Sequence, residues 1–101
     1  MFRRSRFAKL IETQLDLFVR EHPDVRADVR ERLEAYNRAD RSEAEELYGD
    51  YLDAVETGTE ILADMRDHYA QTLEDGDGYI RDFNRSVARR LPEYALEIEN
   101  R

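Results

Sequence analysis

Two carboxylates and a histidine, Glu60, Asp64 and His68, have the spacing in this 101-residue chain that comes nearest to a chemical site. Steps of four residues place all three on one face of a helix, where their side chains could ligate a divalent cation. This spacing matches no established metal motif, and an acidic, solvated face with an ordinary exposed histidine is the simpler interpretation. Glu60, Asp64 and His68 are therefore weak metal candidates, and they define the alternative function: a small helical metal-binding protein or enzyme.

Other chemical sites find less support. A carboxylate-bridged dimetal centre in a helical bundle needs Glu-x-x-His, but Val19 and Met65 lie three residues before the two histidines. The absence of cysteine excludes thiolate chemistry and cysteine-ligated metals. No serine lies in a nucleophile-elbow pattern, and the segment from Gly76 to Gly78 is too short for a phosphate-binding loop. We predict no catalytic residue and no cofactor.

The strongest pattern in the sequence is an apolar repeat in steps of four and three, which keeps one seam of a helix against a partner. It predicts a long central helix over about residues 43–74. The full repeat is Ala44, Tyr48, Tyr51, Val55, Gly58, Leu62, Met65 and Tyr69. We predict that seven of these form an interface: Tyr48, Tyr51, Val55, Gly58, Leu62, Met65 and Tyr69. Core packing of the three tyrosines is favoured over an aromatic groove that grips a ligand.

Two helices are predicted before the central one. The first runs from about Ser5 to His22 and ends because the residue before Pro23 is pushed out of the helical region. Pro23 then suits the first turn of a second helix. Residues 24–47 contain no glycine or proline, so one continuous helix over residues 24–74 is the alternative. The apolar face rotates between the two segments, however, which favours a break at about residues 38–42.

Local signals complete the helical pattern. Ser42 and Glu45 fit a capping box at the start of the central helix. The segment from Asp75 to Gly78 is predicted to be a turn, because its two glycines allow positive φ. A further helix follows it, with the apolar stripe Ile80, Phe83, Val87 and Leu91, and Pro92 stops it before a last short helix.

Together these elements predict an all-α, antiparallel helical bundle of about four helices around the long central helix. The first two helices should pack along the central one, and the last long helix should fold back along its C-terminal half. At this length the chain forms a single domain, residues 1–101. The central helix is much longer than either helix before it. Part of its seam is then bare unless a second copy covers it, so we expect a homodimer.

Charge excludes some partners. The net charge of −8 opposes binding to nucleic-acid phosphates and to anionic membranes. Twelve acidic residues and one basic residue, Arg66, lie between Ser42 and Gly78. This acidic surface could be solubilising, could bind a basic protein or a hard cation, or could be neutralised by arginines near the two ends of the chain. Those arginines are Arg3, Arg4, Arg6, Arg85, Arg89 and Arg90.

No apolar run approaches the roughly 20 residues that span a bilayer. The basic start, Met1 to Phe7, is not followed by the apolar region of a secretory signal, so a cytoplasmic protein is expected. The sequence favours an acidic, non-enzymatic helical interaction or structural module that self-associates, with a basic protein as the alternative partner.

Overall fold

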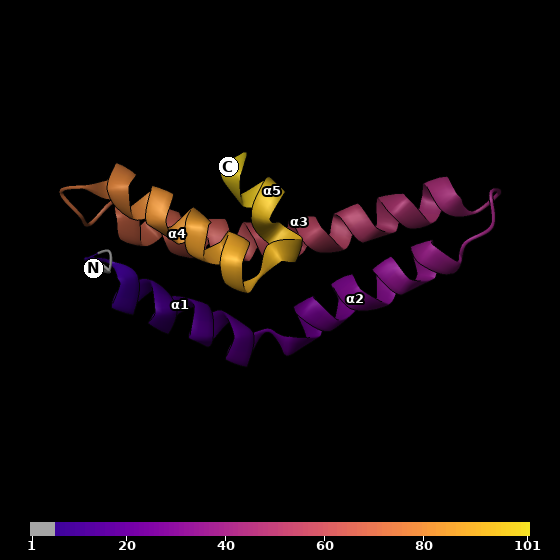
Figure 1. Cartoon of the computed structure of the whole chain (residues 1–101), viewed down its shortest axis with the longest axis horizontal. Helices are drawn as coiled ribbons and strands as arrows, with labels where there is room; N and C mark the ends of the chain where they lie inside the picture. Colours follow the sequence, from indigo (N-terminus) through magenta and orange to yellow (C-terminus); the bar gives the residue numbers. More distant parts are fainter. Residues whose placement is uncertain (1–5) are drawn as a thin grey trace, which may run out of the picture.

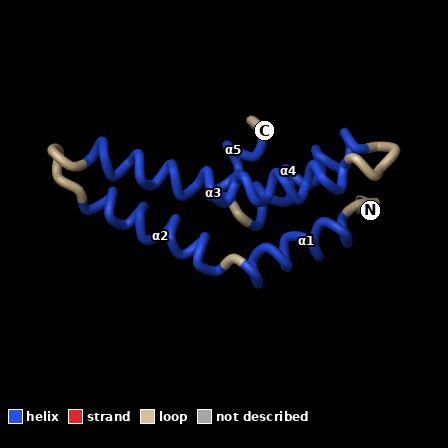
Figure 2. Tube along the Cα trace, turned by 180° about the vertical axis from the view of Figure 1, so that it is seen from behind, coloured by secondary structure: helices blue, strands red, loops and turns tan. Residues whose placement is uncertain are grey.

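Helices joined by short turns make up the structure, a computed structural model that describes residues 6–101 (Figure 2). Of the described residues 83% are helical, and none of them forms a strand. The prediction of an all-α bundle is confirmed.

The helices follow the predicted order with shifted ends. Their bounds are α1 Ala8–Glu21, α2 Pro23–Arg38, α3 Ala44–Ala70, α4 Gly76–Arg90, the 3-10 helix η1 Pro92–Tyr94 and α5 Ala95–Glu99. The predicted break at residues 38–42 is confirmed, because α2 ends at Arg38 and α3 begins at Ala44. The central helix is shorter than predicted, since it stops at Ala70 and a turn follows. The predicted start at Ser5 lies outside the described residues.

The capping box predicted from Ser42 and Glu45 is wrong. No side chain caps α3. Instead, Asp40 Oδ1 accepts hydrogen bonds from Ser42 Oγ at 2.6 Å and from the Glu43 N–H at 3.2 Å. An aspartate side chain that accepts from a backbone N–H a few residues later forms a turn. Because the Ser42 hydroxyl donates to Asp40, it does not cap α3. The hydrogen bond from Ser42 also lowers the pKa of Asp40.

The turn lies earlier than predicted, at residues 71–75, because Gly76 to Gly78 already belong to α4, and no glycine takes positive φ. Asp75 precedes the helix and its Oδ1 accepts a hydrogen bond from the Gly78 N–H at 3.0 Å. A Cβ at Gly78 would lie 2.7 Å from the carboxyl carbon of Asp75. A Cβ at position 78 would therefore displace the Asp75 carboxylate from its capping position, and this close contact rather than a positive φ constrains the residue.

The molecule is thick at one end and thin at the other (Figure 1). In the thin half, α2 packs along the first half of α3 as an antiparallel hairpin. In the thick half, α4 folds back along the rest of α3, as predicted, while η1 and α5 pack across α3 near its middle. The first helix differs from the prediction, because α1 packs mainly against α4 rather than along α3. The principal extents are 50 × 28 × 24 Å.

Candidate contact surface on the α2–α3 hairpin

The predicted seam of α3 divides into a buried part and an open part. Val55, Gly58 and Leu62 are buried by helices of the same chain. Met65 and Tyr69 are half-buried against the core. At the other end of the seam Tyr51 is half-buried and Tyr48 is 44% exposed. Within residues 6–101, therefore, only the Tyr48 end of the seam is open to a partner.

Gly58 shows why a small residue is needed in the buried part. The aromatic ring of Tyr94, from η1, lies directly against the α3 backbone at this position. A Cβ on Gly58 would lie 2.5 Å from Cζ of Tyr94 and 2.6 Å from its hydroxyl oxygen. The close approach at Gly58 is thus made by the chain's own C-terminal segment.

Arg66, the one basic residue between Ser42 and Gly78, is buried at 2% exposure. Its Nη1 donates to Asn84 Oδ1 at 2.9 Å and to the backbone oxygen of Ile98 at 3.0 Å, while Nε pairs with Asp67 at 2.8 Å. Arg66 therefore connects α3 to both α4 and α5. Sequence reasoning missed this role; the isolation of one arginine in an acidic stretch was the available signal.

Two buried tyrosines were also missed. Tyr79 and Tyr94 are both fully buried, and burial raises the pKa of each to about 12. The predicted stripe of α4 began at Ile80, which is half-buried, whereas the four-residue steps from Tyr79 through Phe83 to Val87 would have located the buried face.

The two tyrosines differ in how their hydroxyls are satisfied. Tyr79 donates to Gln14 Oε1, but the Tyr94 hydroxyl is buried without a hydrogen-bond partner among the described residues. An unsatisfied buried polar group costs about 1–3 kcal/mol. We therefore expect Tyr94→Phe to leave stability unchanged or to raise it by up to about 1 kcal/mol, and Tyr79→Phe to lower it by about 1 kcal/mol. Urea unfolding followed by circular dichroism measures both; equal losses would contradict the assignment.

Apolar side chains gather at the open end of the hairpin. Four large apolar residues are exposed among residues 6–101, and three of them lie on α2 and α3: Leu33 at 39%, Tyr48 at 44% and Leu52 at 41%. Tyr36 joins them, with its ring centroid 5.1 Å from that of Tyr48, which in turn lies 6.0 Å from Tyr51. We call Leu33, Tyr36, Tyr48 and Leu52 the hairpin patch.

The hairpin patch ends where the C-terminal segment begins. Along α3, Glu56 lies one helical turn after Leu52 on the same face, and it pairs with Arg101 at 3.7 Å. Along α2, Leu33 lies two turns beyond Arg26, which pairs with Glu93 of η1 at 3.2 Å. The patch therefore lies on the face of the hairpin that η1 and α5 cover nearer the middle of the molecule.

The opposite face of the hairpin is polar. A shallow hollow there is lined by charged residues from both helices and by Thr57. Within it Arg32 pairs with Asp28 at 2.9 Å and with Asp50 at 3.8 Å. Ala35 and Leu47 line a neighbouring hollow on this face, so it differs from the hairpin patch by its charged side chains.

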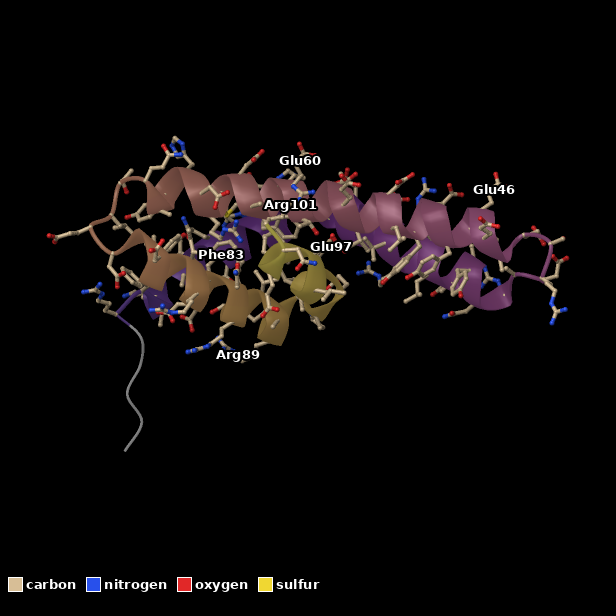
Figure 3. All side chains as sticks on the ribbon, turned by 90° about the horizontal axis from the view of Figure 1, so that it is seen from above. Glu46, Glu60, Phe83, Arg89, Glu97 and Arg101 are labelled. Atoms are coloured by element: carbon tan, nitrogen blue, oxygen red, sulfur yellow. The ribbon has the colours of Figure 1, made fainter. Side chains whose placement is uncertain are left out.

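The sequence-predicted metal residues do not form a site. Glu60, Asp64 and His68 are all exposed, and the described part of the chain has no group of three metal-ligating side chains. Glu46 and Glu60 project from the edge of α3 that faces away from α4 and α5 (Figure 3). This placement is typical of a solvated face.

Few of the terminal arginines compensate the acidic surface. Arg6 pairs at 2.7 Å with Asp75, one of the twelve acidic residues, whereas Arg90 pairs at 2.6 Å with Asp16 of α1, outside that stretch. Three acidic residues of α3, Asp50, Asp67 and Glu56, form ion pairs with Arg32, Arg66 and Arg101 respectively. Arg3 and Arg4 lie outside the described residues.

Comparison of this chain with protein-family models, with curated proteins and with solved structures finds no match. None of the helices in residues 6–101 is long and apolar enough to cross a lipid bilayer. The assignment of function therefore depends on the surface itself.

Proposed function

We propose that this chain is a non-enzymatic helical interaction module that self-associates through the hairpin patch. The observation that carries the proposal is the clustering of exposed apolar side chains on one face of α2 and α3. Single apolar residues scattered over a surface need no explanation, whereas a contiguous group of them marks a contact site. The aromatic content fits as well, because tyrosine is enriched in interfaces between proteins.

The architecture of the thin half supports the same function. A two-helix hairpin can bury only the side chains between its helices, and here the buried residues of that half are few: Val29, Ala54 and Val55. Bundles gain stability when further helices cover the remaining apolar face. In the thick half α4, η1 and α5 supply that cover, whereas the described residues supply none over the hairpin patch.

Replacing Leu52 with glutamate tests this function. Leu52 is 41% exposed, so Leu52→Glu should leave the helical content and the unfolding midpoint close to wild type. A buried charge in the contact should weaken association at least about tenfold, which corresponds to about 1.4 kcal/mol. Light scattering coupled to size exclusion measures the mass over a concentration series.

The matched control is Ala88→Glu, which adds the same charge at an exposed position of α4. It should associate like wild type. Val55 and Leu62 are unsuitable for this test because both are core residues. A monomeric wild-type chain at millimolar concentration, or equal association by wild type and Leu52→Glu, would contradict the proposal.

A further inference from the structure

The end of the layer formed by α4, η1 and α5 makes a step on the surface of the molecule. On the thick side of the step this layer covers α3. On the thin side the same face of the hairpin exposes Leu33, Tyr48 and Leu52. The pairs Glu56–Arg101 and Arg26–Glu93 mark the edge, since they tie the C-terminal segment to α3 and α2 where the hairpin patch ends. Figure 3 shows α4 and α5 beside the middle and second half of α3, whereas α2 is the helix beside its first half.

We infer that the hairpin patch receives the hairpin of a second copy, in antiparallel orientation about a two-fold axis, so that the two hairpins form a four-helix bundle. This inference rests on the proposed self-association and adds its geometry. A two-fold dimer buries the same patch on both subunits, which requires a self-complementary surface. Two stepped molecules placed thin half on thin half satisfy this requirement.

Shape excludes the parallel alternative. Two copies placed face to face with their hairpins parallel would bring both C-terminal layers into the same space, because each layer stands on the contact face beside the patch. The antiparallel arrangement separates the two C-terminal layers, because each then lies at the outer end of the partner's hairpin. This orientation lets the apolar faces of the two hairpins meet without placing the two layers in the same space.

The charges at the two ends of the hairpin patch on α3 agree with the antiparallel orientation. Glu45 is exposed at the outer end of the row that contains Tyr48 and Leu52. Arg101 lies at the inner end, where its pair with Glu56 leaves a third of its side chain exposed (33%). Antiparallel packing brings each Glu45 to the partner's pair of Glu56 and Arg101, whereas parallel packing keeps the outer ends of the two acidic helices together.

Cysteine cross-linking tests the geometry, because the chain has no cysteine of its own. The patch on α3 is centred between Tyr48 and Leu52, so the axis should pass near the level of Asp50 and Tyr51. At a rise of 1.5 Å per residue, Glu45 and Glu56 then lie about 8 Å on either side of that level. All three cysteine positions, Leu52, Glu45 and Glu56, are exposed in the chain.

Mild oxidation with copper phenanthroline should give a covalent dimer for Leu52→Cys alone. A mixture of Glu45→Cys and Glu56→Cys should give the mixed dimer in large excess over either self-linked dimer. Efficient self-linking of Glu45→Cys would overturn the antiparallel geometry, and so would the absence of both expected dimers while the uncross-linked variants still sediment as dimers. If the variants and wild type are all monomeric, the proposed function fails as well.

Discussion

Arg66→Ala should destabilise the chain by about 2–4 kcal/mol, because it leaves two neutral acceptors without a donor and each unpaired buried acceptor costs about 1–3 kcal/mol. The substitution leaves a cavity and removes the donors that Asn84 and the backbone oxygen of Ile98 now accept from. Unpaired buried acceptors carry their full desolvation cost. The loss is a large fraction of the whole stability of a small domain, which is about 5–15 kcal/mol.

Chemical unfolding monitored by circular dichroism at 222 nm measures this loss. Arg66→Met retains most of the side-chain volume, so it should cost less than the alanine variant and separate the hydrogen bonds from the cavity. Arg85→Ala removes an exposed arginine of α4 and should change stability by less than about 0.5 kcal/mol. Losses below about 1 kcal/mol for both Arg66 variants would show that the network does not hold α5 on α3.

Alanine at the two glycines inside α3 should have opposite effects. A methyl group added at Gly49 would meet nothing within 4 Å beyond the backbone of its own helix, so Gly49→Ala should stabilise the helix by about 1 kcal/mol. At Gly58 the same methyl group meets the ring of Tyr94. That ring is fully buried and packs edge-on against Phe18, with a centroid distance of 5.9 Å. Overpacking of this kind costs about 1–3 kcal/mol, so Gly58→Ala should be destabilising despite its better helix propensity.

A double-mutant cycle identifies the cause. Removing the ring with Tyr94→Leu should make the added methyl group at position 58 neutral or favourable, which gives a coupling energy of at least about 1 kcal/mol between the two positions. Thermal and urea unfolding of the four proteins provide the data. Additive effects, or equal stabilisation by Gly49→Ala and Gly58→Ala, would contradict the contact between η1 and α3.

The helices and their breaks could be predicted because their signals are local. Pro23 separates α1 from α2, and the rotation of the apolar face between Leu33 and Ala44 separates α2 from α3. The caps were less predictable, since Asp40 and Ser42 compete for the same backbone groups and the sequence does not show which prevails. Local signals thus set the elements but not the details of each turn.

The contact surface was only partly predictable, because burial depends on residues far apart in sequence. The seam pattern located the apolar face of α3, yet it could not show that Tyr94 would cover Gly58 or that Ile98 would accept from Arg66. It also did not distinguish Tyr48 from Val55, which share the seam but differ in exposure. That difference follows from the part of α3 that residues 92–101 cover, since Tyr94 packs on Gly58 and Arg101 pairs with Glu56.

The most direct test of the hairpin patch as a contact surface is sedimentation velocity over a concentration series. Wild type and Leu52→Glu are measured side by side. We predict that the wild type shifts from about 12 kDa to twice that mass as concentration rises, while Leu52→Glu remains monomeric with unchanged helical content. A wild-type chain that sediments as an elongated monomer at every concentration, or a variant that dimerises like wild type, would contradict this account.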